Sequence, residues 1–98
     1  MNYYGEMARQ HWARWLPQQY ATIEEPDSFF SDLGNHASDR IAELAGQFAS
    51  ENLPNESYLD RVGRLGQARR QAEEIVLPEM ILLAPEPGTS EETENHQV

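Results

Sequence analysis

Four polar side chains lie at three- and four-residue steps, a spacing that would place them on one face of a helix. They are Asp32, His36, Asp39 and Glu43, and carboxylates with an imidazole are suitable ligands for several divalent metals. A helix face of this composition is more commonly just solvated, and Arg40 lies beside it as a partner for an intrahelical ion pair. We therefore expect no metal site and no cofactor, and we treat these four residues as an acidic face.

The other reactive side chains do not match the spacing of a catalytic site. The sequence holds no Ser-His-Asp arrangement, no glycine-rich phosphate-binding loop and no helical metalloprotease motif. It has no cysteine, which excludes disulfides and zinc-thiolate sites. A small helical core also leaves little room for a buried pocket. We therefore expect a non-enzymatic protein.

Arginine supplies all of the basic charge, and four of these residues lie between positions 61 and 70. Helical phase places Arg69 in the middle of an otherwise apolar face, where a charge needs a partner. Its stem could pack while the guanidinium reaches solvent or pairs with a carboxylate. Alternatively Arg69, with Arg61 and Arg64, could anchor a partner protein, since arginine is enriched in binding hot spots.

Aromatic side chains crowd the first quarter of the chain. Trp12 falls toward the edge of its helical stripe, so part of this surface is expected to stay exposed. Core packing accounts for most of these rings, but an aromatic rim is also a suitable protein-binding patch. We therefore include Tyr4, Trp12 and Trp15 with the three arginines in a predicted partner-binding surface.

The elements that would position these residues are helices. Apolar steps of three and four predict a helix over residues 3–16, which Pro17 ends, and a short second piece over 17–23. Asp27 or Ser28 is a suitable N-cap for a long helix. Its apolar stripe is the strongest core signal and consists of Phe30, Leu33, Ala37, Ile41, Leu44 and Phe48.

A third long helix is expected to begin after Ser57, which is a suitable N-cap. Pro78 should kink or end this helix near Leu77 and leave residues 80–83 as an apolar extension. Gly34 and Gly46 lie near the apolar face of the preceding helix, where they would let a neighbour approach closely. The stripe of the third helix consists of Tyr58, Val62, Leu65, Ala72, Val76 and Met80.

Composition divides the 98 residues into a helical domain, 1–83, and a disordered acidic tail, 84–98. The expected fold is all-α, a small three-helix bundle with kinked helices. The net charge of −10 disfavours direct nucleic-acid binding. The first 14 residues lack a signal-type apolar segment, and the longest apolar run, 80–84, is too short to span a bilayer. We therefore expect a cytoplasmic protein without membrane contact.

The pattern of residues along these helices and at their ends resembles that of the TnpV family, small proteins encoded on transposons and other mobile elements. Tyr4-Gly5 with Met7, then Pro17 and Tyr20, is similar to the opening segment of that family. The run Ala72-Glu73-Glu74-Ile75-Val76, preceded by Arg69, is similar to its closing helix. The resemblance implies a mobile-element context and carries no catalytic activity that can be transferred.

Two hypotheses about function follow. The first is a small accessory protein of a mobile element that binds another protein, or a second copy of itself, through the aromatic and arginine surfaces. The alternative is an acidic inhibitor of a host defence nuclease, of the anti-CRISPR kind, whose acidic face imitates a phosphate backbone. Salt dependence separates them, because apolar association is insensitive to screening.

Overall fold

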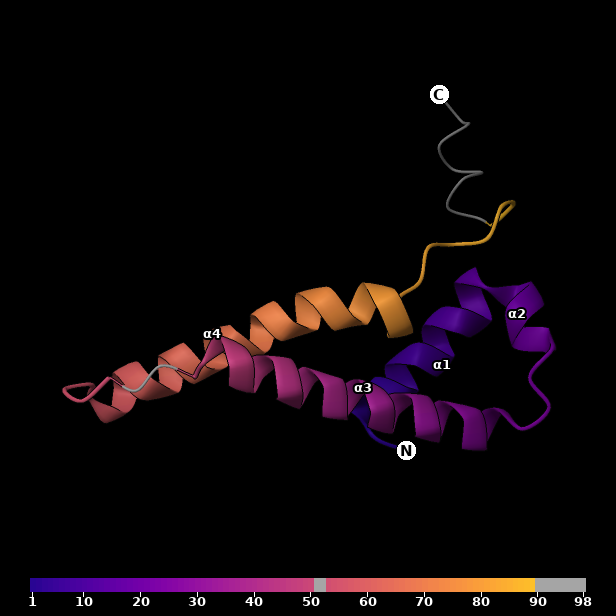
Figure 1. Ribbon diagram of the computed structural model, residues 1–98. Coiled ribbons are helices and arrows are strands. Elements are labelled where there is room, and N and C mark those ends of the chain that lie inside the picture. The colour runs from indigo at the N-terminus through magenta and orange to yellow at the C-terminus, as the bar shows by residue number, and fades with distance from the viewer. Residues whose placement is uncertain (51–52, 90–98) are drawn as a thin grey trace, which may run out of the picture.

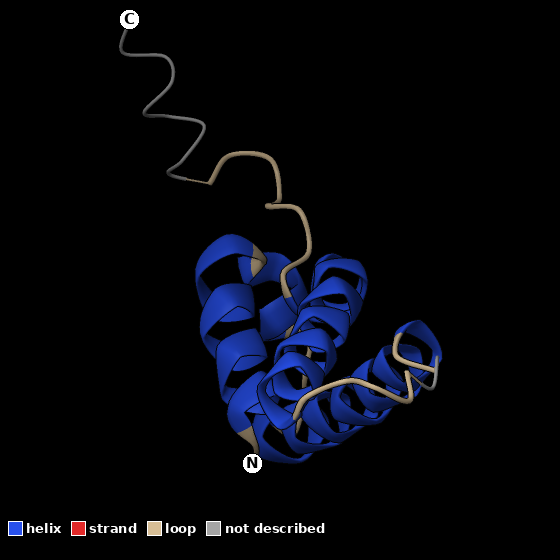
Figure 2. Cartoon of the chain, turned by 90° about the vertical axis from the view of Figure 1, so that its left-hand side faces the viewer, coloured by secondary structure: helices blue, strands red, loops and turns tan. Residues whose placement is uncertain are grey.

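Helices account for all of the regular secondary structure in the described part of the computed structural model, residues 1–50 and 53–89 (Figures 1 and 2). The predicted all-α class is confirmed. Along these residues the elements follow in the order α1 (Tyr3–Trp15), α2 (Pro17–Ala21), α3 (Pro26–Phe48), α4 (Tyr58–Val76) and the π-helical turn η1 (Leu77–Ile81).

Side-chain caps and a proline determine where the helices begin. The Asn2 side chain accepts a hydrogen bond from the Gly5 amide at 2.8 Å, and the Ser57 hydroxyl accepts one from the Asp60 amide at 3.0 Å. The predicted cap of α3 by Asp27 or Ser28 is wrong, because this helix already begins at Pro26. Proline suits the first helical position, since its φ is preset and its missing N–H would have no helical acceptor there.

Pro78 ends α4 close to the predicted point. A proline within a helix lacks the amide hydrogen and crowds the carbonyl four residues earlier. Here the backbone widens into η1, in which the Leu82 amide donates to the Leu77 carbonyl at 2.6 Å. The chain therefore continues to pack after the proline, and Ile81 is fully buried.

The long helices α3 and α4 form an antiparallel hairpin, and α1 packs across the first half of α3 (Figure 1). Phe30 and Ile41 of α3 are fully buried. They belong to a core to which α1, α3, the last turns of α4 and η1 all contribute. The core consists of Tyr4, Ala8, Trp12, Leu16, Phe30, Ala37, Ile41, Leu44, Ala72, Val76 and Ile81.

Two glycines set the contact between α1 and α3. A Cβ atom added at Gly34 would lie 2.6 Å from the Gly5 nitrogen and 2.8 Å from its Cα. The predicted close approach at Gly34 is thus confirmed. The same prediction for Gly46 is wrong, because nothing lies within 4 Å of a Cβ added there.

The segment after η1 is held against α1 and α2, so the tail does not begin at Ala84 as predicted. The Glu86 amide donates to the Trp15 carbonyl at 2.8 Å. The Glu86 carboxylate accepts from the amides of Gln18 and Gln19, each at 3.0 Å. Leu16 is the N-cap of α2 and offers no side-chain acceptor, so Glu86 satisfies these amides from a distance in sequence. Residues 90–98 lie outside the described residues.

Candidate protein-binding surface

Tyr4 and Arg69, both predicted to bind a partner, contact each other inside the chain. The buried Tyr4 hydroxyl donates to Glu73 Oε2 at 2.6 Å and accepts from Arg69 Nη2 at 2.9 Å. Burial raises the pKa of Tyr4 above its usual value, and the adjacent Glu73 carboxylate raises it further, against the effect of Arg69. Of the two readings of Arg69, the structure therefore places it in an internal pair that joins α4 to α1.

Trp12 is a core residue, and its predicted exposure is wrong. Its indole Nε1 donates to the Ile81 carbonyl at 3.0 Å, and its ring packs edge-on against Phe30. Trp15 is half-buried, with the Arg14 guanidinium 4.6 Å above its ring. Neither the edge position of Trp12 nor the crowding of aromatic residues is thus evidence of a free patch.

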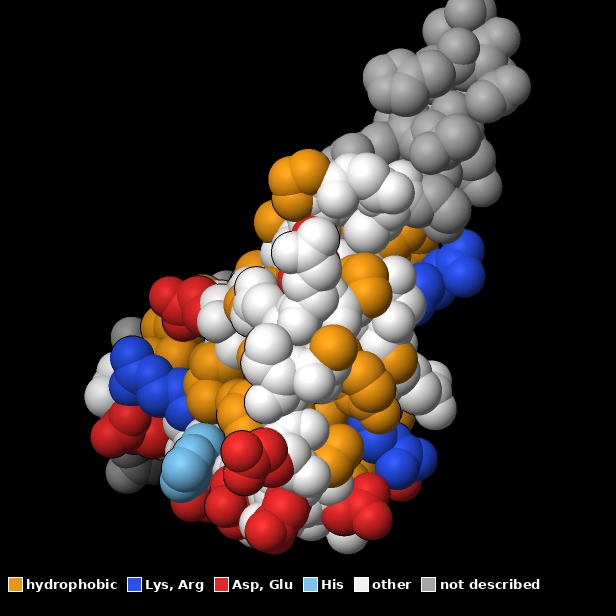
Figure 3. All heavy atoms as spheres, turned by 90° about the vertical axis from the view of Figure 1, so that its right-hand side faces the viewer, with side chains coloured by type: hydrophobic (Ala, Val, Ile, Leu, Met, Phe, Trp, Pro, Cys, Tyr) orange, Lys and Arg blue, Asp and Glu red, His pale blue; other side chains and the backbone are white. Residues whose placement is uncertain are grey.

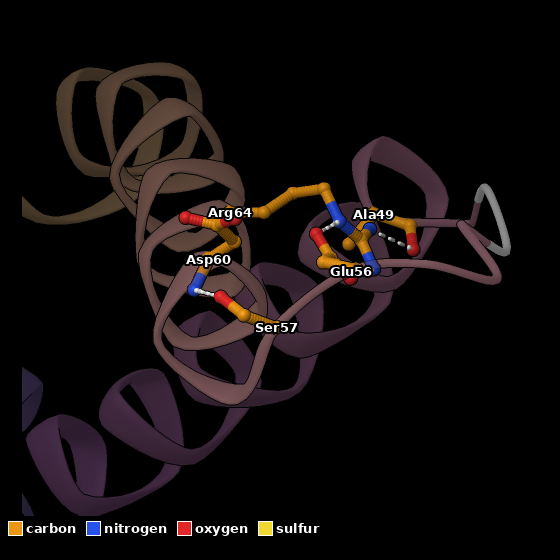
Figure 4. Close-up of polar contacts among 5 residues, drawn as sticks. All are labelled: Ala49, Glu56, Ser57, Asp60 and Arg64. Carbon is orange, nitrogen blue, oxygen red and sulfur yellow. Dashed lines mark hydrogen bonds and ion pairs between the residues drawn. The ribbon is translucent and has the colours of Figure 1, made fainter.

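Arg64 stabilises the turn between α3 and α4 through hydrogen bonds to both of its sides (Figure 4). Its Nε and Nη2 donate to the two oxygens of Glu56 at 2.7 and 3.0 Å, and its Nη1 donates to the Ala49 carbonyl at 3.0 Å. The hydrogen bond from Arg64 holds the pKa of Glu56 below its usual value. Of the three predicted arginines, only Arg61 is both exposed and outside these contacts.

The acidic face lies in solvent. Asp32, His36, Asp39 and Glu43 are all exposed, and Glu43 accepts a hydrogen bond from Arg40 at 2.6 Å. No group of three or more possible ligands is placed to hold a metal ion in the described residues. Carboxylates gather along the lower edge of the molecule in the view of Figure 3.

The hairpin of α3 and α4 extends beyond α1, and we call this extension the arm, residues 38–50 and 53–67. Asn2 contacts Asn35 of α3, and Tyr4 contacts Arg69 of α4, so the N-terminal end of α1 lies at this level of both helices. At 1.5 Å per residue, α1 is about 20 Å long and α3 about 35 Å. Beyond this level the arm consists of the two helices alone (Figure 1), although Ile41 and Leu44 at its base are still buried.

Apolar side chains predicted as core are exposed on the arm. Tyr58, Val62 and Leu65 continue the buried line of Ala72 and Val76, yet they are 78, 48 and 41 % exposed. The prediction is wrong here because the pattern continues along α4 past the point where α1 ends. Phe48, the last residue of the α3 stripe, is likewise 43 % exposed.

We call the exposed apolar side chains of the arm the arm face; their exposed areas add up to about 700 Å² when typical residue areas are applied to the exposed fractions. Leu53 and Leu59 belong to it and were not predicted. Leu59, 77 % exposed, lies one position after the stripe, and this displacement was the available sequence signal for a second apolar direction. The arm face consists of Phe48, Leu53, Tyr58, Leu59, Val62 and Leu65.

No family model, curated protein or solved structure matches the chain. None of the described helices combines the length and the apolar character needed to cross a membrane.

Proposed function

We propose that this protein acts without catalysis, by binding another polypeptide through the arm face. The observation that carries the proposal is the continuation of the core stripe of α4 into a region that α1 does not cover, where Tyr58, Val62 and Leu65 are exposed, together with Phe48 at the end of α3. The summed exposed area of about 700 Å² is of the size of the largest apolar patches on monomers, about 300 to 600 Å², which are often functional. An amphipathic helix or helix pair is the kind of partner that fits an exposed apolar helix face.

The chemistry of the ionisable groups supports binding over catalysis. Perturbed pKa values cluster at catalytic sites. Here they occur at Tyr4 and Glu56, which accept or donate in contacts between the chain's own elements. These contacts stabilise the fold and leave the two groups without an evident role toward a substrate.

The proposal keeps the mobile-element context, for which the support is the resemblance of residues 4–83 to TnpV proteins. It also keeps a cytoplasmic location, since a chain without cysteine has no feature that favours an oxidising compartment.

Imitation of nucleic acid is the second candidate, because the acidic face is exposed. Its carboxylates are few and one of them is paired with Arg40, which weakens a match to a regular phosphate row. The side chains of the arm face are apolar and exposed, which suits binding to another polypeptide, so we favour protein binding.

Photo-crosslinking in the native host tests the proposal. A benzophenone amino acid placed at Leu59 reports on the arm face, and the same residue at Asp39 is a matched control on the acidic face, because both positions are exposed on the arm. We expect a specific polypeptide adduct from position 59 and little from position 39. An adduct from position 39 alone would favour the nucleic-acid mimic and contradict the arm as the binding site.

A further inference from the structure

We infer that the polypeptide on the arm face is a second copy of this chain. This rests on the proposed function and names its partner. Two arms would pack face to face about a two-fold axis, so that each covers the arm face of the other. The product is a four-helix bundle with two helices from each copy.

The geometry of the arm suits this arrangement. A two-fold axis places the same patch on both sides of an interface, so a single apolar surface satisfies both partners. The arm projects away from α1 and α2, and the remainder of each copy can lie at the outer ends of the pair (Figure 1). The two helices of the arm are antiparallel, which is how neighbouring helices pair in a four-helix bundle (Figure 1).

The exposed area is close to what a stable dimer needs. Standard interfaces bury about 800 Å² on each partner, and the six side chains of the arm face alone expose about 700 Å². The flanks of the two helices would add to this. A chain of 98 residues buries a modest fraction of its apolar surface alone, so it gains more from association than a large domain does.

Charge also favours the arm as the place where two copies meet. The chain carries a net charge of −10, which opposes self-association in general. Residues 38–67 contain three arginines and five carboxylates, a net charge of −2, so most of the total of −10 lies in the rest of the chain. Two copies therefore repel each other least along this part of the surface.

Sedimentation of the purified full-length chain, at concentrations from about 1 to 300 µM, tests the inference. We expect the average mass to rise from that of one chain to twice that value and then stop, as closed two-fold symmetry requires. Raising salt from about 50 to 500 mM should preserve or strengthen the dimer, because it screens the repulsion between two acidic chains.

Two double variants separate the interface from general effects of charge. Leu59→Glu with Val62→Glu places carboxylates on the arm face, and we expect dimerisation to weaken by at least about 100-fold because each would be buried without a partner. Gln67→Glu with Gln71→Glu is the matched control, since it adds the same charge to the opposite side of α4. The control should dimerise like the unmodified chain, and circular dichroism should show that both variants keep their helices.

A chain that stays monomeric at about 300 µM overturns the inference. Equal loss of the dimer in both double variants, or open-ended growth of the assemblies, also contradicts it. These failures differ from failure of the proposed function. A monomeric chain that crosslinks to a different polypeptide from position 59 would refute the dimer and still support protein binding through the arm face.

Discussion

Replacing Gly34 by alanine should weaken the fold, although alanine is the better helix former. The substitution gains about 1 kcal/mol in helix propensity. Against this, the added Cβ would lie 2.6 to 2.8 Å from backbone atoms of Gly5, which cannot rotate away as a side chain can. Overpacking typically costs 1 to 3 kcal/mol, and contact with rigid backbone should add to this. We expect a net loss of about 2 kcal/mol.

Urea unfolding followed by circular dichroism measures this loss. For a domain of this size, about 2 kcal/mol also corresponds to a fall of roughly 10 °C in melting temperature. Gly63→Ala is the control, because nothing lies within 4 Å of a Cβ added at that position of α4. It should stabilise the chain by 0.5 to 1 kcal/mol as an order of magnitude. If Gly34→Ala proved as stabilising as Gly63→Ala, α1 would not cross α3 at these glycines.

Four further substitutions test other parts of the fold. Leu44→Ala should cost about 2 to 4 kcal/mol, whereas Phe48→Ala should cost less than about 1 kcal/mol in dilute solution, as urea titration can determine. Tyr4→Phe should cost about 1 kcal/mol. The pKa of Tyr4 is raised in the folded chain, so its hydroxyl stabilises the fold below a pH of about 10. This stabilisation disappears as the pH rises through the folded pKa. The free energies of unfolding of the unmodified chain and of Tyr4→Phe should therefore converge at high pH. Glu86→Ala should cost about 1 kcal/mol, because the amides at the start of α2 lose their acceptor. An unchanged free energy of unfolding in this variant would show that the segment after η1 does not dock on α2.

Much of the fold could be predicted because local rules determine it. The three- and four-residue apolar steps indicated the long helices, and Pro17, Ser57 and Pro78 marked their ends. The close approach at Gly34 was also readable, since a glycine on an apolar stripe has few other uses.

The surface could not be predicted because it depends on contacts between distant residues. Whether Tyr58 and Val62 are buried depends on how far α1 reaches along α4, which no local pattern encodes. Trp12 is buried because η1 places the Ile81 carbonyl within reach of its indole. Glu86 is ordered because α2 lacks an acceptor of its own, a pairing across more than sixty residues.

Thiol labelling tests the central claim most directly, that the arm face is bare in one chain and covered in an assembly. The chain has no cysteine, so Val62→Cys introduces a unique thiol on this face, and Ala72→Cys introduces one in the core. At high dilution we expect maleimide to label position 62 at close to the rate of a free thiol and position 72 at least about 100-fold more slowly. Concentrating the protein should then protect position 62. Protection of position 62 at every dilution would mean that the chain covers its own arm, and rapid labelling at every concentration would mean that no second copy binds there.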